Sequence, residues 1–135
     1  MKLVREHIIF EKFVTDSDPI TDMGIGMMQQ IKEWMKSIHI EFTDKDRALF
    51  ICSAYGKTKF VKYLLDAGAD VHTLNDNALH WACYEGYIEI VKILIDAGAD
   101  VHAVNDDALR CASDNGHTDV VKLLEYHIAN EKNKN

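Results

Sequence analysis

Residues 76–105 read DNALHWACYEGYIEIVKILIDAGADVHAVN, and this stretch recurs along the chain. Sliding the sequence by thirty residues places it on residues 46–75, DRALFICSAYGKTKFVKYLLDAGADVHTLN, with half of the positions identical. The same shift forward matches from Asp106 to Leu124 and then diverges. Self-similarity at a fixed period of this size predicts an array of small supersecondary units that stack on one another.

Each unit predicts two short helices. Asp76 and Asn77 are N-cap types that precede the apolar residues of a first helix, which Gly86 would end in the left-handed region. A second helix is expected over residues 88–97 and should stop at Gly98. Its apolar residues recur at helical spacing: Ile90, Val91, Leu94 and Ile95. Because neither helix can bury its stripe alone, neighbouring units must stack, which predicts an all-α helical solenoid with Leu64, Leu94 and Leu124 buried.

These residues resemble the ankyrin-repeat family. The family pattern is Thr-Pro-Leu-His, an alanine pair, Gly-His, a Val-Val or Ile-Val pair, Leu-Leu and Gly-Ala-Asp-Val-Asn. Matching elements run in register through residues 46–125, and they include residues 77–80, Gly86, Ile90-Val91, residues 93–95 and residues 98–102. The resemblance implies an ankyrin-type solenoid that binds protein partners and carries no enzymatic activity.

The repeats also depart from that family. The family period is about thirty-three residues, and the shortfall here lies between Val71 and Leu79, where the family builds a projecting β-turn finger. We therefore expect shortened fingers. The Thr-Pro start is missing from all three units. Both departures are similar to the short-period ankyrin proteins encoded by giant amoeba viruses of the mimivirus type.

The composition restricts the class of protein. A chain of 135 residues is expected to fold as one small domain that buries roughly two-thirds of its unfolded surface. Its formal charge of −7 disfavours nucleic-acid binding, which needs clustered basic residues. We expect no membrane span and no secretory signal, because apolar runs are short and the start MKLVREHIIF carries charges. Cys52, Cys83 and Cys111 predict reduced, buried thiols in a cytoplasmic or nuclear monomer, or in the host cytoplasm if the protein is viral.

Both ends of the array should be atypical. Residues 1–45 predict an N-terminal helical cap, with one helix near residues 5–14, a break at Pro19 and a strongly amphipathic helix over residues 27–38. A shift of thirty aligns Gly26 with Gly56, so residues 16–45 can be read as a degenerate repeat. The predicted organisation is then repeats at 46–75, 76–105 and 106–130, the last serving as C-terminal cap, and a disordered tail at 131–135.

We find no pattern typical of a catalytic, cofactor or metal site. His80 and Cys83 share a helix face and Cys111 lies on the next unit, but a zinc site would need a fourth ligand and closely paired spacing. His80 occupies the position of the family's structural histidine, which implies bonds to backbone groups. His72 and His102 are expected to form hydrogen bonds within their turns. Gly24-Ile25-Gly26 is only part of a dinucleotide fingerprint.

The family's binding surface is its concave face, made by the first helices and the turns before them. Carried over position by position, the candidate partner-binding residues are Tyr55, Tyr84, Glu85, Asp114, Asn115, Leu74, Asn77, Val104 and Asp107, with Ala54, Thr73, Asp76 and Asp106 beside them. Tyrosine combines apolar area with a polar tip, so Tyr55 and Tyr84 are the expected anchors. Neutral drift would give the same variation between units. A second alternative is an adaptor or host-directed effector whose residues 1–45 recruit another partner.

Overall fold

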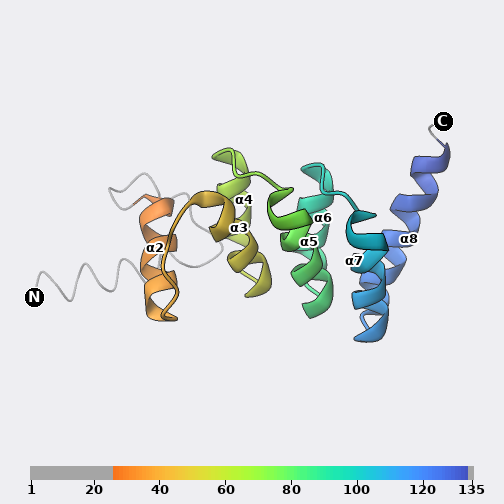
Figure 1. Ribbon diagram of the computed structural model, residues 1–135, viewed down its shortest axis with the longest axis horizontal. Coiled ribbons are helices and arrows are strands. Elements are labelled where there is room, and N and C mark those ends of the chain that lie inside the picture. Colours follow the sequence, from red (N-terminus) through yellow and green to blue (C-terminus); the bar gives the residue numbers. More distant parts are fainter. Residues whose placement is uncertain (1–25, 134–135) are drawn as a thin grey trace, which may run out of the picture. The chain divides into compact units, whose positions relative to one another are not determined.

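The computed structural model describes residues 26–133, in which it contains seven helices and no strand (Figure 1). The chain divides into two compact units, residues 1–43 and 44–135. The first contains α2 (Met27–Ser37), and the second contains α3 (Lys45–Ala54), α4 (Thr58–Asp66), α5 (Thr73–Glu85), α6 (Ile88–Asp96), α7 (Ala103–Asp114) and α8 (Thr118–Asn133). The all-α prediction is confirmed. The helix expected near residues 5–14 and the break at Pro19 lie outside the described residues.

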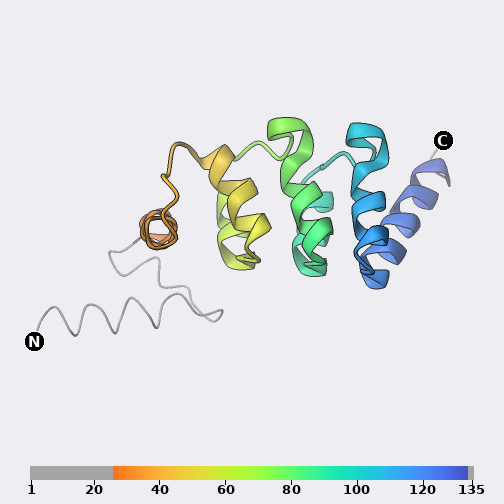
Figure 2. The same ribbon diagram turned by 60° about the horizontal axis from the view of Figure 1, so that its bottom comes forward.

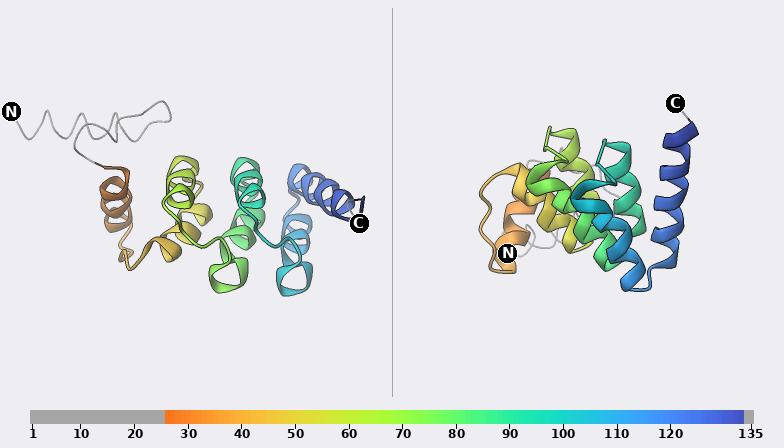
Figure 3. Two further views of the ribbon diagram at one scale, coloured as in Figure 1. Left: turned by 90° about the horizontal axis from the view of Figure 1, so that it is seen from above. Right: turned by 45° about the vertical axis from the view of Figure 1, so that its right-hand side comes forward.

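The helices of the second unit form two layers, which are seen from above in the left view of Figure 3. An inner layer consists of α3, α5 and α7, in which α3 packs on α5 and α5 packs on α7. An outer layer consists of α4, α6 and α8, which contact one another in the same order. Each repeat therefore contributes one helix to each layer, as a helical solenoid requires. None of the helices within residues 26–133 is both long and apolar enough to cross a bilayer.

The core lies between successive repeats. Leu64, Leu94 and Leu124 occupy equivalent positions in α4, α6 and α8, and each is fully buried. The inner helices contribute mainly small residues at their contacts, among them Ala48, Ala78, Ala82, Ala108 and Ala112. Small side chains let the inner helices approach closely, while the leucines fill the space between the layers. The predicted burial of the three leucines is confirmed.

Gly86 ends α5 in the left-handed conformation, with φ 81°. A Cβ atom at this position would lie 2.5 Å from the His117 ring of the next repeat. The His117 ring also donates a hydrogen bond from Nε2 to the Tyr84 carbonyl oxygen, at 2.9 Å. The glycine thus terminates a helix and makes room for a side chain that ties two repeats together. A Cβ atom at Gly56 would likewise lie close to a ring of the next repeat, 3.0 Å from that of Tyr87.

The turns between repeats are short, as expected, and contain no strand. The turn at the start of α5 continues from His72 into three consecutive left-handed residues, Leu74, Asn75 and Asp76, with φ between 56° and 59°, and the regular helix follows them. Val104, Asn105 and Asp106 repeat this conformation at the start of α7, with φ between 54° and 62°. Figure 2 shows both turns as tight loops at one end of their helices. A left-handed turn of three residues replaces the projecting finger.

Asp76 differs from the sequence expectation, which made it an N-cap and a candidate contact residue. Its side chain is buried, and Oδ1 accepts the backbone N–H of Asp100 at 3.3 Å and contacts His72 Nδ1 at 2.8 Å. Asp46 likewise accepts the N–H of Asp70, at 2.8 Å. The carboxylates of both residues thus point toward the following repeat. Asp76 therefore links repeats and is not accessible to a partner.

Helix α2 is amphipathic, as predicted. Met27, Ile31 and Met35 recur at helical spacing and are buried, whereas Trp34 and Ile38 are partly exposed. The assignment of residues 16–45 as a degenerate repeat that caps the array stays a prediction.

At the C-terminal end, α8 has sixteen residues where α4 and α6 have nine. The expectation of a disordered tail from residue 131 is wrong for residues 131–133, which are helical. The Glu131 carboxylate explains the extension, because it contacts His102 Nε2 at 3.1 Å and His127 Nε2 at 3.3 Å. Glu125, which replaces the leucine or isoleucine of the earlier repeats, is exposed, as the polar outer surface of a last repeat requires.

Leu94→Ala should lower the free energy of unfolding by roughly 2–5 kcal/mol, because the site between two repeats cannot collapse fully around the cavity. Urea denaturation of the full chain measures the loss. Ile95→Ala is the matched control, since Ile95 is only partly buried on the same helix. If Leu94→Ala costs no more than Ile95→Ala, Leu94 does not occupy the core position described above.

Candidate functional site

Most of the predicted contact residues are accessible on the inner layer. Tyr55 follows α3 and is 50% exposed, and Tyr84 near the end of α5 is 41% exposed. Glu85, Asp114 and Asn115, at the ends of α5 and α7, are also exposed. Because equivalent ends of stacked helices lie along one edge of the layer, these residues belong to one side of the molecule.

Tyr84 is held by its neighbours. Its ring meets the Trp81 ring edge-on with centroids 5.3 Å apart, and lies nearly parallel to the His80 ring at 6.3 Å. The hydrogen bond from His117 fixes its carbonyl group. A half-exposed tyrosine whose ring is already ordered loses little conformational freedom when a partner covers it. This makes Tyr84 well suited as a contact anchor.

The turn residues gather in a second place. A cleft of about 190 Å³, here named the turn cleft, lies between the N-terminal parts of α5 and α7. It is lined by residues 74–77, Leu79 and His80 on one side and by Asp100, Ala103, Val104, Asp107 and Ala108 on the other. Four predicted residues, Leu74, Asn77, Val104 and Asp107, are thus brought together. Leu74 and Val104 are 51% and 55% exposed at its rim.

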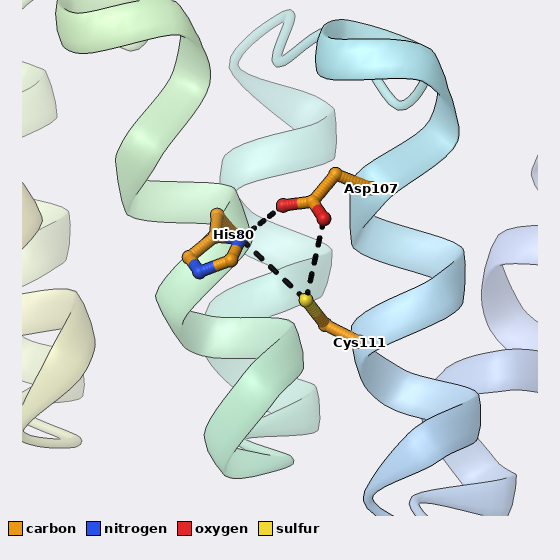
Figure 4. A group of neighbouring side chains, drawn as sticks. All are labelled: His80, Asp107 and Cys111. Carbon is orange, nitrogen blue, oxygen red and sulfur yellow. Dashed lines mark hydrogen bonds and ion pairs between the residues drawn. The ribbon is translucent and has the colours of Figure 1, made fainter.

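His80 contacts the next repeat through a side-chain cluster drawn in Figure 4. Its Nδ1 is hydrogen-bonded to Asp107 Oδ2 and lies 3.6 Å from Cys111 Sγ. Cys111 Sγ is also 3.6 Å from Asp107 Oδ1. His80 therefore bonds side chains of α7, where the resemblance implied backbone groups. Its sulfur neighbour is Cys111, and Cys83, which shares its helix, is completely buried.

Sequence analysis considered His80 with Cys83 and Cys111 and missed Asp107, which contacts both His80 and Cys111. The signal was present in the repeat itself. A shift of thirty carries position 80 to position 110, and Asp107 and Cys111 lie three residues before and one residue after it. Asp107 and Cys111 are four residues apart and share one face of α7, the helix that packs against α5.

The three cysteine thiols are not activated. Burial raises the pKa of Cys52 and of Cys83 to about 12. Burial, together with the negative charge of Asp107, also raises the pKa of Cys111. For Asp107 itself, partial burial opposes ionisation, but hydrogen bonds from His80 and Arg110 outweigh it and hold the pKa below its usual value. At neutral pH these thiols are protonated, which is not the state of a nucleophilic cysteine.

The turn histidines behave as predicted. His72 Nδ1 lies 2.8 Å from Asp76 Oδ1, and His102 Nδ1 lies 2.5 Å from Asp106 Oδ1. Their backbone N–H groups donate to the side chains of Asp70 and Asp100, both at 2.9 Å. Hydrogen bonds to Asp106 and Glu131 raise the pKa of His102. These hydrogen bonds give both histidines a structural role in the turns.

Comparison with protein families gives one match. The family model described as ankyrin repeats, in three copies, matches residues 25–105 and, in a second overlapping placement, residues 49–135. Together the placements include every helix of the described residues. No curated protein matches the chain.

The left-handed turn predicts that glycine substitutions at two adjacent positions, 103 and 104, change the free energy of unfolding in opposite directions. Val104, β-branched at φ 54°, carries strain of roughly 1–2 kcal/mol, which glycine would remove. Glycine also has more freedom in the unfolded chain, so Val104→Gly should raise the free energy of unfolding by only about 0.5–1 kcal/mol. Ala103→Gly, at a helical position without strain, should lower it by about 0.5–1 kcal/mol. Urea denaturation of both variants measures the difference, and equal losses would show that residue 104 is not left-handed.

Proposed function

The chain belongs to the ankyrin-repeat family, and on that basis we propose that it is a non-enzymatic module that binds a protein partner across its inner layer and turn cleft. Ankyrin repeats are generally protein–protein interaction modules. The proposal adds to this which face the chain uses, which residues form the contact and what kind of partner they suit.

The exposed apolar side chains carry the proposal. Among the described residues, five large hydrophobic side chains are exposed: Tyr55, Leu74, Tyr84, Val104 and Tyr126. Four of these belong to the inner helices or to the turns that precede them. Apolar groups gathered on one side of a small protein favour an interaction surface, whereas neutral drift would scatter them over both layers. Tyrosine is also the residue type that most often dominates binding energy at interfaces.

The charges around these residues indicate the partner's chemistry. Glu85 and Asp114 are exposed at the ends of the inner helices, and the whole chain has a formal charge of −7. A partner with an apolar pocket for Tyr84 beside basic residues would complement this surface. Nucleic acid would be repelled by the same charge. The proposed partner is therefore a protein with a basic rim around an apolar site.

Tyr84→Ala should weaken binding of that partner by roughly 1–3 kcal/mol, because it removes a preordered anchor. The immobilised full chain, its Tyr84→Ala variant and a Lys92→Ala control on the outer layer are compared for the proteins that each retains from a cell lysate. A protein kept by the wild type and the control but lost by Tyr84→Ala is then measured by calorimetry. The melting temperature of Tyr84→Ala should stay close to that of the wild type.

Glu85→Lys on the same edge should slow association, and the effect should shrink at high salt because exposed charges are screened. If Lys92→Ala or Glu89→Ala reduces binding while Tyr84→Ala does not, the partner uses the outer layer and the proposed face is wrong.

The alternative function is an adaptor or host-directed effector in which residues 1–45 recruit a second partner. The similarity to viral ankyrin proteins has no support from a relative, so a host-directed role rests on that similarity alone.

A truncated chain of residues 40–135 separates the two functions. If the N-terminal unit is a distinct recruiting element, the truncated chain should stay folded and still bind the inner-layer partner. If the unit is only a cap, its removal should lower solubility and melting temperature together, because an apolar face of the first repeat becomes exposed. Circular dichroism melting and the calorimetric assay distinguish these outcomes.

A further inference from the structure

We propose that His80, Asp107 and Cys111 form a metal site that binds Zn²⁺ and clamps α5 to α7. Each residue offers one donor atom, and the three donor atoms lie within 4.8 Å of one another. They come from two neighbouring repeats, so an ion bound among them would bridge a junction that packing and hydrogen bonds already hold. His80 and Asp107 also line the turn cleft, but metal binding and its test require no partner.

The donor set suits zinc. Zn²⁺ binds cysteine sulfur, imidazole nitrogen and carboxylate oxygen, and sites with three protein ligands keep one position for water. Mg²⁺ and Ca²⁺ prefer oxygen ligands alone and would leave the thiol and the imidazole unused. A thiolate and a carboxylate together would neutralise the charge of the ion. His80 and Asp107 have side chains that are 30% and 22% exposed, so an ion and its water can enter from solvent.

The two distances from Cys111 Sγ agree with tetrahedral coordination. Bond lengths of 2.3 Å to sulfur and 2.0–2.2 Å to nitrogen or oxygen place neighbouring donor atoms roughly 3.6 Å apart in a tetrahedron. Cys111 Sγ lies 3.6 Å from His80 Nδ1 and 3.6 Å from Asp107 Oδ1. The third pair, His80 Nδ1 and Asp107 Oδ2, shares a hydrogen bond and must open when the metal replaces the proton.

The surrounding contacts fix the ligands. Asp107 and Cys111 are four residues apart on α7 and therefore share a face. The His80 ring lies against the Tyr84 ring, which limits its rotation. One contact opposes binding: Arg110 donates from Nη2 to Asp107 Oδ1 at 3.0 Å, and its positive charge would be near the ion. The Arg110 side chain is 58% exposed and can turn toward solvent.

The preceding junction provides an internal comparison. A shift of thirty residues places Phe50 at the position of His80, Asn77 at that of Asp107 and Trp81 at that of Cys111. The same backbone geometry there carries no set of metal ligands. The proposed site is thus confined to the junction between the second and third repeats, and the same comparison supplies a substitution that the fold already accommodates, Asp107→Asn.

Cobalt titration of the reduced full chain tests the site. Co²⁺ replaces Zn²⁺ in such sites and, when bound by a thiolate in a tetrahedral field, gives a near-ultraviolet charge-transfer band and intense visible bands. We expect both at a stoichiometry of one, with loss of both on addition of Zn²⁺. Zn²⁺ alone should raise the melting temperature, since it binds the folded chain preferentially.

Cys111→Ala should abolish the charge-transfer band, and Asp107→Asn should weaken Co²⁺ binding by at least about tenfold, which is what even supporting contacts of metal ligands contribute. His72→Gln is the matched control for surface histidines and Cys52→Ala for the other thiols, and both should bind Co²⁺ as the wild type does. Circular dichroism verifies that each variant is folded. The absence of a charge-transfer band from the folded wild type would overturn the proposal, as would a band that survives in Cys111→Ala and Asp107→Asn.

Discussion

Burial of the apolar stripe of each repeat against its neighbours is the constraint on which the array of α3–α8 depends. Helices α3 to α7 have nine to thirteen residues each, a length at which an isolated helix is marginal in water. Leu64, Leu94 and Leu124 become fully buried only because another repeat lies beside each of them. Helix α8 departs from the pattern of the earlier repeats, since Glu125 is exposed where they carry leucine or isoleucine and the helix continues to Asn133.

Polar links between repeats set the register of this packing. Asp46 and Asp76 accept backbone N–H groups one repeat later, and His117 donates to the Tyr84 carbonyl one repeat earlier. Each such bond contributes only about 1 kcal/mol net, but an unpaired buried group would cost more. Asp106, the third member of the aspartate series, has no further repeat to link within residues 26–133 and is exposed beside His102. The links therefore specify one alignment of repeats, while the apolar contacts supply most of the stability.

The sequence predicted what local periodicity determines and missed what depends on the next repeat. The helices, the glycine at 86 and the buried leucines follow from spacing along one unit, and all are found as expected. Leu74 and Val104 gave no sign of a left-handed backbone, because neither residue type favours it. Asp76 looked like an N-cap until the turn directed it to Asp100. His80 was considered with Cys83 and Cys111 but not with Asp107, its hydrogen-bond partner one repeat away in α7. Side-chain partners across a junction require the stacking geometry as well as the repeat length.

The left-handed turns bear on function because their backbone strain lowers the stability of the fold and burial does not offset it. Glycine or asparagine would adopt this conformation with less strain than leucine or a β-branched valine. Leu74 and Val104 are also more than half exposed, so burial returns little of that cost. Strained residues that packing does not require are concentrated at binding and catalytic sites. Apolar side chains kept at the rim of the turn cleft, at the expense of both strain and solubility, favour a surface that a partner covers.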